Sequence, residues 1–155
     1  DIQVDTNTAH PNLSVSQDRK SFTHTSQVQK VAQKEESFDS SVCVLGSEGF
    51  SSGKHYWEVE VEKNHDWDLG VARKSAPRKG VINLAPGRGF WALGMSFKDY
   101  WARTEPWTRV MVQKSPRKVG VYLSWEEKTL TFFNVDDRSA MFTFRDCNFS
   151  EEVYP

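Results

Sequence analysis

The sequence is poor in the features that mark secreted, metal-binding or membrane-spanning chains. Its 155 residues contain only two cysteines, Cys43 and Cys147, at a spacing that fits no metal motif. We expect buried free thiols in a reducing compartment, while a disulfide between them stays open. No apolar run approaches the ~20 residues that a membrane-spanning helix needs. A secretory signal pattern is also missing, although we expect the chain to start within a longer protein, where an upstream signal could precede it. We therefore expect a cytoplasmic domain that does not itself insert into a membrane.

Neither sign of charge is in excess. The 20 Lys and Arg residues face 21 Asp and Glu residues, which gives a net charge of −1. This balance argues against a general nucleic-acid or membrane-surface binder. Long segments with helical periodicity are missing too, whereas six Trp and ten Phe make the chain rich in aromatic residues. Both facts favour an all-β domain.

Catalytic patterns are absent as well. The four histidines stand singly in the sequence, and His55 alternates with Trp57 on an apolar face, where a core histidine is commoner than a ligand. Glu58, Glu60 and Glu62 form a row that is more typical of a solvated strand face than of a catalytic pair. The Gly87–Gly89 run lacks the following helix of a dinucleotide loop. We assign no catalytic residue, no metal site and no cofactor.

The stretch 44–72 is the most informative part of the sequence. In the segment 54–62, His55, Trp57, Val59 and Val61 alternate with Tyr56 and three glutamates. Side chains alternate across a strand, so Val59 should be buried and Glu58 and Glu60 exposed. In the segment 67–72, Trp67, Leu69 and Val71 share one face, and Asp68, Gly70 and Ala72 share the other.

The rest of the chain repeats this pattern of short strands and turns. A length of 155 residues fits one domain that buries roughly 70% of its unfolded surface. We predict a nearly continuous apolar strand at 90–95, a hairpin partner at 97–102 and a clear hairpin formed by 118–123 and 128–135. Shorter strands are expected at 13–15, 22–26 and 141–144, with 38–45 leading into the central stretch. The polar segment 27–36 is expected to be a surface loop.

The run Leu-Gly-Ser-Glu-Gly-Phe-Ser-Ser-Gly-Lys-His-Tyr-Trp-Glu-Val-Glu-Val, followed by Trp-Asp-Leu-Gly-Val-Ala, strongly resembles the PRY-SPRY domain of tripartite-motif ubiquitin ligases and butyrophilins. The resemblance covers the whole chain, with 1–45 similar to the PRY segment and 46–155 similar to the SPRY segment. It implies a single domain, a bent antiparallel β-sandwich of two sheets.

This chain departs from the family pattern at a few positions. Thr6 stands where the family usually has proline, and Lys128 stands in place of a hairpin glycine. If that position needs a positive φ, Lys128 costs ~1 kcal/mol. The family normally continues beyond the segment that ends here at Pro155, so one sheet would have an open edge, which could support self-association. We expect a neighbouring molecule or a rearranged segment to cover this edge, or further residues to follow Pro155.

The resemblance implies a protein-interaction module that recognises a target through variable loops on a rigid sandwich. In a tripartite-motif ubiquitin ligase of innate immunity, such a module would select the substrate, and a separate RING domain would recruit the charged enzyme. We expect the loops 64–68, 97–107 and 145–151 to converge at one end. The candidate contact residues are Asp68, Ser96, Phe97, Tyr100, Trp101 and Phe149. An equally weighted alternative is that Tyr100 and Trp101 only complete the core.

A second hypothesis comes from the butyrophilins, whose domains can sense small phosphorylated metabolites in a basic pocket. Charge-assisted contacts could hold a pyrophosphate here. The candidate cations are Arg73, Lys74, Arg78, Lys79 and Arg88. A third hypothesis is a purely structural domain without a partner. The sequence leaves the identity of the partner open.

Overall fold

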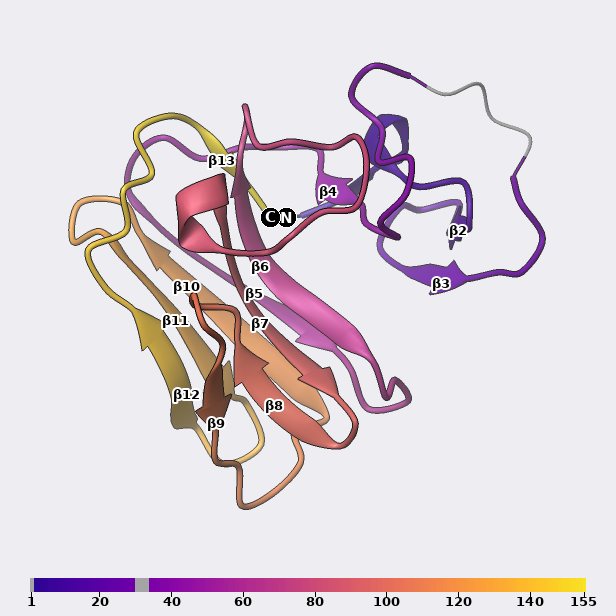
Figure 1. Cartoon of the computed structure of the whole chain (residues 1–155). Helices are drawn as coiled ribbons and strands as arrows, with labels where there is room; N and C mark the ends of the chain where they lie inside the picture. Colours follow the sequence, from indigo (N-terminus) through magenta and orange to yellow (C-terminus); the bar gives the residue numbers. More distant parts are fainter. Residues whose placement is uncertain (1, 30–33) are drawn as a thin grey trace.

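The computed structural model describes residues 2–29 and 34–155, and it shows two antiparallel sheets that pack face to face (Figure 1). The prediction of an antiparallel β-sandwich with little helix is confirmed, because the helical elements of these residues are two short 3-10 turns, η1 (Thr6–Thr8) and η2 (Pro86–Arg88). Within the same ranges, no helix is long and apolar enough to cross a membrane.

The first sheet has four strands in the order β12 (Ser139–Phe144), β11 (Thr129–Asn134), β10 (Lys118–Ser124) and β5 (Lys54–Glu60). Its centre is the predicted hairpin of β10 and β11. Lys128 in the hairpin turn has a φ of 57°, so the substituted glycine position does need the left-handed conformation. The ammonium of Lys128 lies 4.8 Å from the ring centroid of Trp125, a cation–π contact that offsets part of the strain.

The second sheet has five strands in the order β13 (Val153–Tyr154), β6 (Trp67–Arg73), β7 (Phe90–Ser96), β8 (Asp99–Ala102) and β9 (Thr108–Val110). The predicted apolar strand is β7, in the middle of this sheet. The predicted partner strand begins later than expected, at Asp99, because Phe97 and Lys98 have φ values of 52° and 68° and form the turn.

The N-terminal segment forms two small strand pairs beside the sandwich (Figure 1). One pairs β1 (Val4–Asp5) with β4 (Leu45–Gly46), and the other pairs β2 (Leu13–Val15) with β3 (Phe22–His24). This segment contributes Phe38 and Leu45 to a small apolar cluster with Ala72 and Phe90, on the face of the second sheet that points away from the main core. Part of the predicted loop 27–36 lies outside the described residues.

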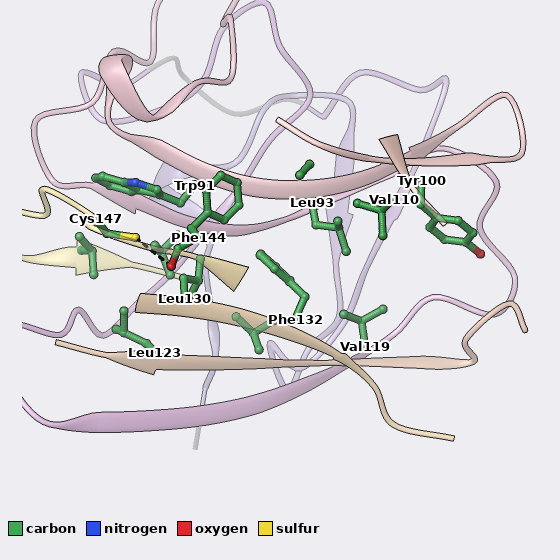
Figure 2. Close-up of a cluster of buried hydrophobic side chains, with 14 of the residues drawn as sticks. Trp91, Leu93, Tyr100, Val110, Val119, Leu123, Leu130, Phe132, Phe144 and Cys147 are labelled. Carbon is green, nitrogen blue, oxygen red and sulfur yellow. Dashed lines mark hydrogen bonds between the residues drawn. The ribbon is translucent and has the colours of Figure 1, made fainter. Parts of the chain in front are cut away.

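The main core fills the space between the two sheets (Figure 2). The first sheet contributes Val121 and Phe132, which are completely buried, and the second contributes Leu93 and Trp91. Cys147 lies in this core, where its thiol donates to the carbonyl oxygen of Phe144 at 3.6 Å. Burial raises the pKa of the Cys147 thiol to about 12 and that of Cys43 to about 11, the latter with help from the negative charge of Asp68. Both cysteines are free and protonated at neutral pH.

Two expectations need correction, one about the burial of Val59 and one about the open sheet edge. Glu58 and Glu60 are exposed as predicted, but Val59 is half-buried rather than buried, because β5 is an edge strand of its sheet. The end of the chain also closes part of a sheet edge, since β13 pairs with Arg73 and Ala72 of β6. The remainder of that edge, 67–71, has no strand partner among the described residues, so self-association through it stays a prediction.

Phe149 was a predicted contact residue, and the structure instead makes it a core residue. It is completely buried, with its ring 5.0 Å from Trp91 and 5.2 Å from Trp125 between ring centroids. Phe149→Ala should lower the free energy of unfolding by about 3–5 kcal/mol, because it removes a large side chain and leaves a cavity. Urea denaturation measures this change. Phe97→Ala is the matched control, since Phe97 is 95% exposed and its loss should leave the midpoint unchanged. Equal effects of the two substitutions would contradict this placement.

Candidate binding surface

The outer face of the five-stranded sheet carries a row of residues from four strands. The register pairs Asp68 of β6 with Gly94 of β7, Gly94 with Trp101 of β8, and Trp101 with Arg109 of β9. Because side chains alternate along a strand, all of them point away from the core that Trp67 and Leu69 pack against. The row therefore crosses the sheet from β6 to β9, and its Trp101 and Arg109 lie on the two strands at the β9 edge.

Gly94 is what lets an ion pair form across this row. A Cβ atom at Gly94 would lie 2.0 Å from Oδ1 of Asp68 and 2.6 Å from Nη2 of Arg103. The bare backbone therefore leaves room for the Asp68 carboxylate to reach over β7, where it accepts a hydrogen bond of 2.7 Å from Nε of Arg103. The Arg103 side chain is only 5% exposed, and that of Asp68 is 33% exposed.

Two tryptophans complete the surface. The guanidinium carbon of Arg103 lies 4.1 Å from the ring centroid of Trp107, a close cation–π contact. Trp107 in turn lies 6.1 Å from Trp101. Trp107 is 54% exposed and Trp101 is half-buried, so both present ring surface to solvent. We name the four residues Asp68, Trp101, Arg103 and Trp107 the Asp-Arg-Trp surface.

The electrostatics of the Asp-Arg-Trp surface combine desolvation with charge pairing. Burial raises the pKa of the Asp68 carboxyl, and the hydrogen bond and positive charge of Arg103 oppose that rise. On the same face, Arg109 pairs with Asp99 at 3.1 Å, but both of those side chains are largely exposed and their pair contributes little to stability.

The structure brings together only part of the predicted contact set. Asp68 and Trp101 lie on one face, while Ser96 and the exposed Phe97 lie at the nearby turn between β7 and β8. Tyr100 is 7% exposed and belongs to the core, as does Phe149. Tyr100 and Trp101 are consecutive in a strand, so they cannot share a face, and the alternative that both complete the core is correct only for Tyr100.

The predicted convergence of three loops is wrong. The turns at 64–66 and 97–98 lie at the same end of the second sheet, since Trp67 pairs with Met95 and Ser96 with Asp99. The segment 145–151 instead lies at the opposite end of β6, where Arg73 donates to the carbonyl oxygen of Phe149 at 3.0 Å and Glu151 accepts from Ser75 (Figure 1).

The basic residues proposed for an anion site mostly serve the local fold. Arg73 stacks on Trp91 besides donating to the 148–149 carbonyls, and Arg78 donates to the carbonyl oxygen of Glu36. Lys79 donates to the carbonyl oxygens of Lys34 and Ser37, both at 2.7 Å. Lys74 and Arg88 are exposed. Three of the five cations therefore hold loops together. Across residues 2–29 and 34–155, no group of His, Cys, Asp or Glu side chains is arranged to hold a metal ion.

Sequence reasoning missed Arg103, Trp107 and the role of Gly94. Two features of the sequence could have identified Gly94 and Arg103, whereas no local pattern indicates Trp107. An isolated glycine inside a strand often marks a close approach of another group, and Gly94 is such a glycine. Continuing the alternation of β8 by one step beyond Ala102 also places Arg103 on the same face as Trp101.

Gly94→Ala tests whether the ion pair depends on the missing side chain. The added methyl group should displace the Asp68 carboxylate and leave the Arg103 guanidinium buried without it, which lowers the free energy of unfolding by about 1–3 kcal/mol. Thermal and urea denaturation measure the change. Gly87→Ala is the control, because a Cβ there meets nothing within 4 Å. In an Asp68→Ala background, Gly94→Ala should add little further loss. A full additional loss there would show that the clash does not act through Asp68.

Comparison with known proteins identifies the family. The family model of the SPRY domain matches residues 54–155, and that of the SPRY-associated domain PRY matches residues 2–50. Human butyrophilin subfamily 1 member A1 is 41% identical over all 155 residues, and human butyrophilin subfamily 2 member A2 is 43% identical over the same length. The chain spans 30% of the length of each of these relatives.

Solved structures agree with this assignment. The TRIM65 PSpry domain superimposes with a TM-score of 0.87 at 23% identity, covering 99% of this chain and 81% of that one, which shows the common fold. The stonustoxin structure superimposes with a TM-score of 0.88 at 30% identity, covering 100% of this chain and 26% of that one. With both family models matched in order along a shared fold, the chain belongs to the SPRY family and carries the PRY segment ahead of its SPRY domain.

Proposed function

We propose that this chain recognises a target protein through the Asp-Arg-Trp surface. SPRY domains are binding modules rather than catalytic domains, which sets the class of function. One observation supports placing the binding site here: Trp101 and Trp107 lie beside the partly buried ion pair of Asp68 and Arg103 on the face of a sheet. Tryptophan and arginine are enriched among the residues that dominate binding energy at interfaces.

The surroundings of this surface support the same function. Phe97, in the turn before β8, is 95% exposed, and Met111, directly after β9, is 80% exposed. Large apolar side chains left in water at the rim of such a surface are typical of an interaction site. The base is a paired five-stranded sheet, so little backbone ordering is needed when a partner binds.

The kind of protein that contains this domain is also a proposal. The two human relatives reported above, at 41% and 43% identity, are butyrophilins, whereas the reported likeness to a tripartite-motif protein rests on shared fold at 23% identity. We therefore favour a butyrophilin-type parent over a ubiquitin ligase of innate immunity, and we propose protein recognition as the function of the module with either parent. Two free thiols with raised pKa values suit a reducing compartment such as the cytoplasm.

Sensing of a phosphorylated metabolite is less well supported by the geometry. Arg73, Arg78 and Lys79 already donate to backbone carbonyls, so a pyrophosphate would have to compete with the loop contacts that they make. Titration calorimetry with inorganic pyrophosphate separates the two functions. The protein-recognition proposal predicts no micromolar binding, and micromolar binding lost on Arg78→Ala would favour the sensor.

Substitution of the surface residues tests the proposed function directly. A partner is first captured from cells by pull-down with cross-linking and then titrated with purified variants. Asp68→Ala and Trp101→Ala should each weaken its binding by more than ~1 kcal/mol, because both lie at the centre of the proposed contact. Tyr56→Ala is the control on the outer face of the other sheet, where Tyr56 is 50% exposed. Unchanged affinity in the first two variants, with folding intact by circular dichroism, would move the site elsewhere.

A further inference from the structure

Arg103 has a donor group that the structure does not satisfy. Its side chain is 5% exposed, and Nη1 is buried without a hydrogen-bond acceptor among the described residues. Nε of the same guanidinium donates to Asp68, so that carboxylate is already engaged on one side. A buried cationic donor without an acceptor is costly, and it gains more from a newly offered acceptor than an exposed lysine or arginine would.

Trp107 covers this guanidinium, and a rotation of its side chain would uncover it. The ring stacks on Arg103 at 4.1 Å, yet the residue is 54% exposed, so turning the side chain outward gives up little burial. The backbone around it is braced, because the Thr104 hydroxyl donates to the carbonyl oxygen of Pro106 at 2.7 Å and lies 2.6 Å from the Thr108 hydroxyl. A rotation of one side chain therefore exposes Arg103 without a rearrangement of the sheet.

The surface is hollowed beside Trp107, although Arg103 itself does not line this hollow while the Trp107 ring covers it. An open depression runs next to it, and its lining residues are Asn83, Leu84, Arg88, Thr104, Glu105, Pro106 and Trp107. Arg88 is exposed there and adds a second positive charge, which Glu105 in the same lining opposes. Asp68 balances Arg103 and Glu105 opposes Arg88, so these four charges cancel, and it is the unmatched Nη1 donor that favours a single anionic acceptor.

We propose that Arg103 binds a carboxylate of the partner, an Asp or Glu side chain or a C-terminal carboxylate, after Trp107 turns aside. A carboxylate matches the planar guanidinium and forms charge-assisted hydrogen bonds, which are about twice as strong as those of neutral acceptors. This inference rests on the proposed protein-binding function and specifies the chemistry that the partner presents. It also explains why an aromatic ring, and not a fixed polar group, lies over the buried donor.

Short blocked peptides test the carboxylate preference on the whole chain. The probes are acetyl-Gly-Glu-Gly-amide, its near-isosteric amide acetyl-Gly-Gln-Gly-amide, acetyl-Gly-Gly with a free C-terminus, and inorganic phosphate. Binding is followed by nitrogen-15 NMR of the Trp107 indole N–H and the Arg103 Nε–H. The Glu peptide should bind at least about threefold more tightly than the Gln peptide and shift both signals. The free C-terminal probe shows whether a terminal carboxylate serves as well as a side chain.

Three variants test whether Arg103 and Trp107 are responsible for the preference for the Glu peptide over the Gln peptide. Arg103→Met keeps the length and apolar stem of the side chain, and it should abolish the preference for Glu over Gln. Trp107→Ala removes the cover and should tighten binding of the Glu peptide. Arg109→Met is the matched control, because Arg109 lies in the same row but already pairs with Asp99, and it should leave the preference unchanged.

Two results would overturn the inference. One is equal binding of the Glu and Gln peptides, or a Glu preference that survives Arg103→Met. The other is tighter binding of phosphate than of the Glu peptide at the same signals, which would assign the site to a dianion. If either occurs while partner capture still depends on Asp68 and Trp101, the proposed function stands and only the carboxylate chemistry fails.

Discussion

The burial of two facing sheet surfaces is the constraint on which the rest of this structure depends. Trp91 and Leu93 on one sheet pack against the layer that contains Val121 and Phe132 on the other, and burial of that apolar area is the main favourable term in folding. Each strand must send alternate side chains inward, so every inward residue fixes an outward neighbour. The choice of residues that fill the core therefore also determines which residues lie on the outer face, where a partner would bind. Tyr100 inside requires Trp101 outside.

The outer face of the second sheet is divided between two uses. At one end, the cluster of Phe38, Leu45 and Phe90 attaches the N-terminal segment to the sheet. Towards β8 and β9, Asp68 and Arg103 meet over the bare backbone of Gly94, and Trp107 stacks on Arg103. The same face thus joins the PRY segment to the SPRY domain and displays a polar and aromatic surface. Its charged groups are held by each other, which keeps the surface ordered before any partner arrives.

The sequence predicted the elements that follow from alternation and turn chemistry. The hairpin of β10 and β11, the exposure of Glu58 and the positive φ at Lys128 could all be deduced from local pattern or resemblance. The contact set was harder because it depends on where loops go in space. Phe149 follows the last long strand in a polar loop, and nothing local shows that the chain turns back to place its ring between two tryptophans. Arg103 was missed because its partner Asp68 is 35 residues away.

The central claim is that partner recognition takes place on the β8–β9 side of the second sheet. Backbone amide hydrogen exchange of the chain, with and without its captured partner, tests this claim most directly, because it needs no substitution and reports on every segment at once. The account predicts new protection in the segment 101–110 and at Asp68, with none in the segment 145–151 at the opposite end of β6. Protection confined to 145–151 and the basic segment 73–88, with 101–110 exchanging as before, would contradict it.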